Sequence, residues 1–228
     1  MDNAVTDNEP ADDVGSISET VENSPQPAAG APETATSAPS RGMRLAKLMG
    51  THVLVFLVAL SLFAAADSWS TITGLGIATL LSVITGALAG ITISTLVHEW
   101  FHYAGARYAG AAFDIPSRQG LFLYDWDFSS NSLRQFLIMS VAGSVGGFVA
   151  VILMWNAVPA DTWGRAALRS GVIASVIFAA LIEWPVIRRA RHSGDPFTEL
   201  SKIDQRLLSR SFAIAGIAGV VMTLIFVP

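Results

Sequence analysis

His98-Glu99-Trp100-Phe101-His102 is an HExxH motif inside one of the most apolar stretches of the chain. Residues four apart lie on one face of an α-helix, one turn on, so both imidazoles can reach a single metal ion. Glu99 projects beside them, where a carboxylate can act as general base on a water at the metal. Ionisable groups are costly in apolar surroundings, which favours a functional role over histidines that only hydrogen-bond within a helix bundle. The motif predicts a Zn²⁺ site with His98 and His102 as ligands and Glu99 as the catalytic base.

A catalytic zinc ion needs a third protein ligand and one open position. The chain has no cysteine, so this ligand has to be a histidine or a carboxylate. The candidates are His52, His192, Glu183, Asp195, Glu199 and Asp204. Glu183 stands in an apolar segment close to Arg188 and Arg189, so it could pair with one of them or face the site. The local sequence favours Asp195 as the N-cap of a following helix, because Pro196 comes next.

Hydropathy predicts five membrane segments, each near the ~20 residues that span the hydrocarbon. They lie at about 50–66, 71–106, 134–156, 166–187 and 211–227. The second is too long for one perpendicular span, so it is tilted, extends beyond the bilayer, or breaks around Gly86 and Gly90.

Composition divides the chain into two parts. Residues 1–40 hold eight acidic residues, five of the ten prolines and no basic residue, which predicts a disordered acidic tail over 1–42. Residues 43–228 form the predicted transmembrane domain. The whole chain is 52% hydrophobic and only 14% charged, about half the charge of soluble domains. The expected partners are the lipid bilayer and a membrane protein, with no nucleic acid.

The basic residues predict the orientation of the segments. They cluster before the first segment, between the second and third, and between the fourth and fifth, which is one side of a five-span protein. The positive-inside rule places that side, and the N-terminus, in the cytoplasm. We therefore expect a multi-pass protein of the inner or plasma membrane, with the HExxH motif toward the cytoplasmic end of its helix.

Residues 120–128 alternate, with Phe122, Tyr124, Trp126 and Phe128 on one face. Period-two alternation is typical of a strand. The residues from Asp114 onward are typical of an extended segment and a turn that precede this strand. The pattern predicts a small β-hairpin at the membrane surface, with an irregular amphipathic loop as the alternative. The expected fold is thus an all-α polytopic membrane protein with about five transmembrane helices and this hairpin.

The segment His98-Glu-Trp-Phe-His-Tyr-Ala-Gly-Ala-Arg-Tyr-Ala-Gly110 resembles the active-site helix of site-2 proteases, which are intramembrane zinc metalloproteases. The resemblance extends over about 90–200. Ala142-Gly143 resembles the glycine-rich helix of the family, although Ser144 stands where a proline is usual and Gly147 where an asparagine is common. Pro185 and Asp195 resemble the segment that supplies the third ligand, but Pro196 replaces the usual glycine.

The resemblance implies a zinc metalloendopeptidase that cleaves a transmembrane or membrane-proximal protein segment. It implies Asp195 as the third zinc ligand and places Gly143 against the site. A strand edge near 120–128, with Phe122 and Tyr124, would align an extended substrate. The alternative is a non-catalytic membrane scaffold or regulator that retains the fold. A transporter or channel has little support, since the chain has no internal repeat.

Overall fold

The computed structural model describes residues 40–116 and 123–227, and this part of the chain is almost entirely helical. Within these described residues, five helices are long and apolar enough to cross a membrane: α1 (Arg41–Thr73), α2 (Gly76–Tyr108), α3 (Leu133–Ala157), α4 (Trp163–Ser193) and α6 (Gln205–Phe226). The short helix α5 (Pro196–Ser201) connects the last two. Two strands, β1 (Phe113–Asp114) and β2 (Asp125–Trp126), form an antiparallel pair. The predicted fold class is confirmed. The predicted tail lies outside the described residues up to position 39, and α1 begins at Arg41, just inside its predicted limit.

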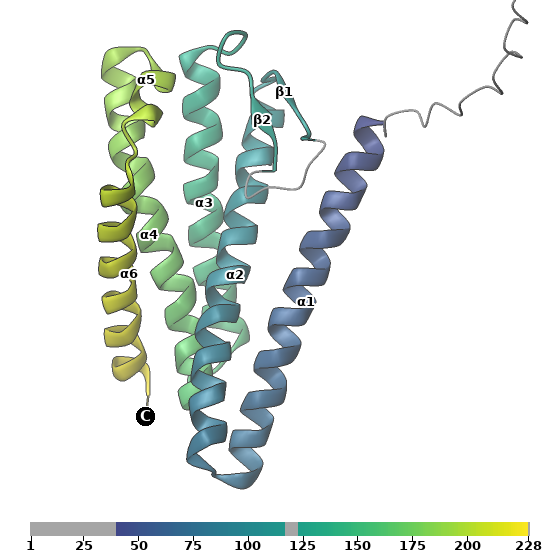
Figure 1. The fold of residues 1–228 in the computed structure, drawn as a ribbon, viewed down its shortest axis with the longest axis vertical. Helices are drawn as coiled ribbons and strands as arrows, with labels where there is room; N and C mark the ends of the chain where they lie inside the picture. Colours follow the sequence, from purple (N-terminus) through teal and green to yellow (C-terminus); the bar gives the residue numbers. More distant parts are fainter. Residues whose placement is uncertain (1–39, 117–122, 228) are drawn as a thin grey trace, which may run out of the picture. The chain divides into compact units, whose positions relative to one another are not determined.

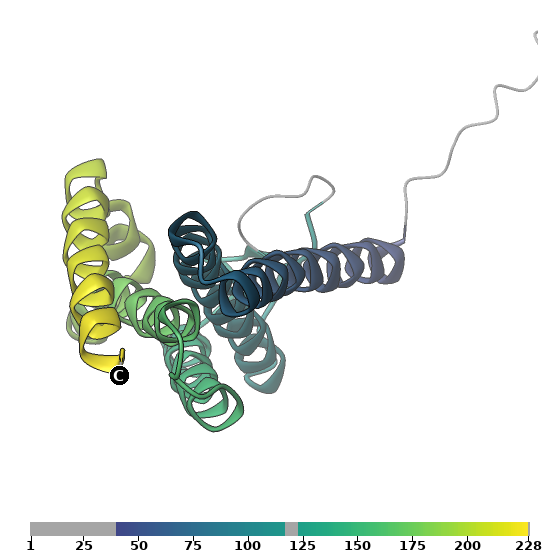
Figure 2. The same cartoon turned by 90° about the horizontal axis from the view of Figure 1, so that it is seen from below.

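Helix α2 is the centre of the bundle. It contacts α1, α3 and α4, whereas α6 packs on α4 (Figures 1 and 2). The start of α1, the strands and α5 gather at one end of the helices, and the α1–α2 and α3–α4 connections lie at the other (Figure 1). The basic residues that flank the spans near the strands and α5 therefore share one end of this part of the molecule.

Local sequence signals set where these helices begin and end. The Ser132 hydroxyl accepts a hydrogen bond from the Gln135 amide, and the Gln135 side chain accepts one from the Ser132 amide, which is a capping box at the start of α3. Helix α1 is terminated by Gly74 and α4 by Gly194, both with positive φ. Glycine has no Cβ, so it adopts this left-handed conformation at little cost.

The second span is an unbroken helix, so the alternative of a break near Gly86 and Gly90 is wrong. Its 33 residues extend over about 50 Å at ~1.5 Å per residue. These glycines serve close packing instead, because a Cβ at Gly86 would overlap the Gly164 carbonyl oxygen and one at Gly90 that of Leu168. Small residues let membrane helices approach closely, and here they bring α2 and α4 together. The first three residues of the predicted second span, 71–73, belong to α1.

The predicted hairpin is present, with Phe113 opposite Trp126 and Asp114 opposite Asp125. Its strands are much shorter than the alternation suggested, and residues 117–122 lie outside the described part. The N-terminal turns of α1 hold the hairpin: the Arg44 guanidinium donates to Asp114 at 3.1 Å, and Leu48 is buried against it.

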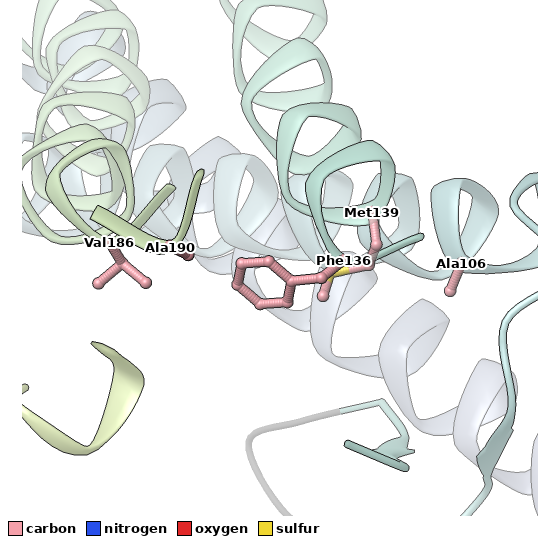
Figure 3. Close-up of a cluster of buried hydrophobic side chains, with 5 residues drawn as sticks. All are labelled: Ala106, Phe136, Met139, Val186 and Ala190. Carbon is pink, nitrogen blue, oxygen red and sulfur yellow. The ribbon is translucent and has the colours of Figure 1, made fainter. Parts of the chain in front are cut away.

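A compact apolar cluster joins α2, α3 and α4 at the hairpin end of the bundle. Its buried members are Ala106, Phe136, Met139, Val186 and Ala190, and Figure 3 shows them projecting from these helices. Tyr124 and Trp126 from the hairpin pack against it. The cluster fixes the ends of α2 and α4 relative to the hairpin, which matters because these three elements carry the chemically interesting side chains.

A second set of buried polar residues lies near the opposite end of the helices. The Asp67 carboxylate accepts hydrogen bonds from Ser82 Oγ at 3.0 Å, Thr162 Oγ1 at 2.8 Å and Arg165 Nε at 3.0 Å. Asp67 is on α1, Ser82 is on α2, and Thr162 is the N-cap of α4. We call these four residues the Asp67 clasp, since they tie three helices together.

Candidate metal centre and cavity

The two histidines of the HExxH motif meet a glutamate from another helix. His98 and His102 are buried on α2 and Glu183 is on α4. Glu183 Oε1 lies 2.7 Å from His98 Nε2 and 3.2 Å from His102 Nε2. The two Nε2 atoms are 3.0 Å apart. Three potential metal-ligand atoms thus converge on one point, and we call these three residues the histidine cluster.

Helix α3 fixes the orientation of His102. Its Nδ1 lies 2.9 Å from the carbonyl oxygen of Met139. A carbonyl only accepts, so Nδ1 carries the proton and Nε2 of the neutral ring presents a lone pair. Such a hydrogen bond to a backbone carbonyl is a common second partner of metal-binding histidines. Gly143 lies against the same imidazole, which a Cβ at that position would overlap.

Glu99 stands beside these ligand atoms without taking one of the three positions. One ligand atom each of His98, Glu99 and His102 lies within 4.8 Å of the others. Glu99 also lines the large cavity that His102 and Glu183 face. This is close enough for the Glu99 carboxylate either to bind a metal ion beside the histidines or to handle a proton next to it.

The donor set fits a zinc ion. Ligand atoms 2.0–2.1 Å from a tetrahedral ion lie about 3.3 Å apart, close to the 2.7–3.2 Å seen in the cluster. His102 Nε2 faces a carboxylate oxygen at 3.2 Å, an arrangement that a proton or a metal cation between the two atoms would stabilise. The second oxygen, Glu183 Oε2, is buried and has no hydrogen-bond partner within the described residues. Two imidazoles and one carboxylate are also a known catalytic zinc set.

Asp195 does not reach the histidine cluster. Helix α4 continues unbroken to Ser193, so roughly 15 Å of helix separates Glu183 from its end. Asp195 is exposed and caps α5, where its carboxylate accepts hydrogen bonds from the Thr198 amide and hydroxyl. These bonds lower its pKa, with the hydroxyl bond as the main cause. The local N-cap interpretation therefore describes Asp195, and the carboxylate that lies beside the two histidines is that of Glu183.

The other ligand candidates are also elsewhere. Glu199 is buried and forms ion pairs with Lys202 at 2.7 Å and Arg189 at 2.9 Å, which lower its pKa. Asp204 caps α6 by accepting from the Leu207 amide. His52 packs edge-on against Trp100 with ring centroids 5.9 Å apart, and His192 is exposed near the end of α4.

A cavity of about 650 Å³ opens beside the histidine cluster. Glu99, His102 and Glu183 form its polar wall. Most of the remaining lining is apolar and comes from the hairpin segment, α3, α4, α5 and the residue Ile203. Phe128 and Phe197 meet across it with ring centroids 5.3 Å apart. The reactive groups therefore face an apolar chamber large enough for side chains of a peptide.

The predicted substrate-binding residues Phe122, Tyr124 and Gly143 differ in their position relative to the cavity. Tyr124 lines the cavity, and burial, together with the charges of Glu99 and Glu183, raises the pKa of its phenol. Gly143 is absent from the cavity lining; it packs on His102. Phe122 lies outside the described residues. Trp126 and Phe128, which share the alternating face of Tyr124, also line the cavity.

Sequence reasoning named Glu183 as one candidate among several without singling it out. Its signal was a lone carboxylate within the apolar segment Leu181–Ile187. No sequence pattern indicates the contact between His102 and the Met139 carbonyl, because any residue supplies a backbone oxygen.

Comparison with protein-family models, curated proteins and solved structures finds no match for this chain. The likeness to site-2 proteases consequently stays a resemblance in the HExxH motif and in the order of the segments that follow it.

Proposed function

We propose that this protein is a zinc-dependent intramembrane endopeptidase of the site-2 protease type. The observation that carries the proposal is the convergence of His98, His102 and Glu183 within 3.2 Å of one another, beside Glu99 and at the wall of an apolar cavity. His98, His102 and Glu183 would hold the ion. When bound, zinc supplies Lewis-acid activation of the scissile carbonyl and of water.

The residues of the chain supply the remaining steps. Glu99 takes a proton from the attacking water as its oxygen adds to the carbonyl carbon. It then passes this proton to the amine nitrogen as the carbon–nitrogen bond breaks, which leaves a carboxylic acid and an amine; the acid then loses its proton to the amine or to solvent. Met139, through its carbonyl, and Gly143, through its lack of a side chain, keep the His102 ring oriented.

The substrate class follows from the cavity and its position. The aromatic and aliphatic walls of the cavity suit apolar side chains. The helices that contribute to these walls include α3 and α4, which are long and apolar enough to cross a membrane. A transmembrane or membrane-proximal segment of another protein, unwound to an extended form, is the proposed substrate. The short hairpin beside the cavity offers an edge for backbone pairing. In the proposed orientation the hairpin end faces the cytoplasm, in an inner or plasma membrane.

The test compares the purified parent with Glu99→Gln in nanodiscs that also hold apolar single-span peptides, with mass spectrometry to identify cleavage. The parent should contain about one zinc ion and cleave, and Glu99→Gln should retain the ion and lose at least a hundredfold in rate. Asp161→Asn is the matched control, because this exposed carboxylate belongs to the opposite end of α4. Cleavage by Glu99→Gln at the parental rate would falsify the mechanism. A parent that holds zinc and cleaves nothing would favour the non-catalytic scaffold.

A further inference from the structure

Hydrolysis of a peptide bond requires more than a base and a metal. When water adds to the carbonyl carbon, the π-electron pair moves to the carbonyl oxygen, which becomes an oxyanion. Enzymes place hydrogen-bond donors at this oxygen, and removal of one such donor typically costs about 10²–10³ in kcat. The proposed function therefore raises the question of which donor in the cavity could serve.

Besides His102, whose Nδ1–H is used by the Met139 carbonyl, four side chains with a polar hydrogen line the cavity among the described residues: Tyr124, Trp126, Ser140 and Ser201. The Ser201 hydroxyl donates to the Thr198 carbonyl at 2.8 Å, and the Ser140 hydroxyl is directed at the sulfur of Met139. Within the described part of the chain, neither the Tyr124 phenol nor the Trp126 indole has a hydrogen-bond partner. These two side chains are the donors free to act on a ligand.

Tyr124 lines the same cavity as Glu99 and Glu183. Burial raises the pKa of its phenol, and the charges of these two carboxylates add to that effect. Burial keeps the phenol protonated, as a donor needs to be. The hydroxyl is not among the buried polar atoms that lack a partner, which is consistent with its opening into the cavity.

The ring of Tyr124 is held on several sides. Its centroid lies 5.2 Å from that of Phe113, 6.3 Å from that of Tyr103 and 6.4 Å from that of Trp126. Aromatic contacts of this kind orient a ring without using its hydroxyl. A fixed ring with a free hydroxyl is a preorganised donor, which is what stabilisation of a transient charge requires.

We infer that Tyr124 is a catalytic residue whose hydroxyl donates a hydrogen bond to the carbonyl oxygen of the scissile bond as that oxygen becomes charged. The inference rests on the proposed function and adds an oxyanion donor to it. Water and Glu99 supply every atom and proton that is transferred. Tyr124 keeps its own proton throughout and acts only through the hydrogen bond.

The experiment uses the zinc-loaded full chain and the variants Tyr124→Phe and Tyr103→Phe. Each replacement removes one hydroxyl and keeps the ring, and Tyr103 belongs to the same aromatic group without lining the cavity. The probe is a Leu–Ala phosphinic dipeptide, whose charged oxygens stand in for the oxyanion. Its dissociation constant is measured by calorimetry, and the ¹³Cζ signals of the three tyrosines are recorded by NMR with and without the probe.

Tyr124→Phe should bind the phosphinate at least tenfold more weakly than the parent, lower kcat about a hundredfold with little change in KM, and retain zinc. Tyr103→Phe should match the parent, and the Tyr124 signal should shift when the probe binds. Equal phosphinate affinity in Tyr124→Phe and the parent would overturn the inference and leave the proposed function standing. A parent that binds neither zinc nor phosphinate would overturn the proposed function, and this inference with it.

Discussion

The histidine cluster and the Asp67 clasp are two buried polar sites that share helices α2 and α4, but their hydrogen-bond acceptors are paired to different degrees. In the clasp, both Asp67 oxygens accept hydrogen bonds, from Ser82, Thr162 and Arg165, and none of its members lines the large cavity. In the histidine cluster, Glu183 Oε2 is buried without a partner and the cavity opens beside it.

The difference distinguishes buried polar groups that stabilise the packing of helices from buried polar groups that are available to bind a ligand. Buried polar groups that are fully hydrogen-bonded hold helices in register, whereas a buried acceptor without a partner is consistent with a role in catalysis or in binding an ion or a water. The two sites are far apart: Ser82 and His98 stand sixteen positions apart on α2, about 24 Å along the axis. Substitutions at one site should therefore leave the other largely unchanged, and this independence can be tested.

The largest expected effect is on the metal. Glu183→Ala should weaken zinc affinity by roughly a thousandfold, because one ligand's share of the ~10–16 kcal/mol of a zinc site is about 4 kcal/mol. Asp195→Ala should leave affinity at the parental value, since Asp195 caps α5 instead. Competition with a zinc chelator measures both. Zinc lost in Asp195→Ala and kept in Glu183→Ala would reverse our ligand assignment.

Asp67→Ala should act on stability and not on zinc. It removes the acceptor of Ser82, Thr162 and Arg165 Nε at the junction of three helices, for which a loss of about 3 kcal/mol is expected. Chemical unfolding in mild detergent, with zinc affinity measured in parallel, gives both values. A parental unfolding midpoint in this variant would show that the clasp is dispensable.

Each site also depends on one glycine, which allows a matched pair of substitutions. A Cβ at Gly143 would overlap the His102 imidazole, and a Cβ at Gly164 would overlap Ser82 Oγ of the clasp. Overpacking typically costs about 1–3 kcal/mol. Gly143→Ala should thus weaken zinc binding about tenfold, while Gly164→Ala should lower the melting temperature at unchanged zinc affinity. Gly50→Ala is the control, because nothing lies within 4 Å of the added atom.

The smallest effect concerns an exposed carboxylate, which is a useful contrast to both buried sites. Hydrogen bonds from Ser129 and Ser130 lower the pKa of Asp127 from 3.8 to about 2. A depressed native pKa contributes stability that is complete above the unfolded value and is lost as pH falls through the native one. The melting temperatures of the parent and Asp127→Ala, measured without zinc, should differ slightly at pH 6, and this difference should shrink as the pH falls from 4 through 2. A difference of the same size at pH 6 and at pH 2 would contradict this assignment.

The sequence by itself determined the features that depend on short-range pattern. The number of long apolar helices follows from hydropathy, and the hairpin from alternating aromatics. The spacing of His98 and His102 places both imidazoles on one face of α2, whatever that face meets. The cap at Asp195 could also be read locally from the adjoining Pro196.

Tertiary structure alone decided what α2 meets. Glu183 reaches the histidines because Gly86, Gly90 and Gly171 let α2 and α4 approach closely, and no local pattern gives the rotation of one helix against another. The same close packing, together with an unbroken α4, keeps Asp195 away from the histidines, although the family resemblance implied it as the third ligand. Long-range contacts determine which residues of different helices meet at a site. The sequence pattern within each helix therefore does not identify these residues, and the packing of the helices does.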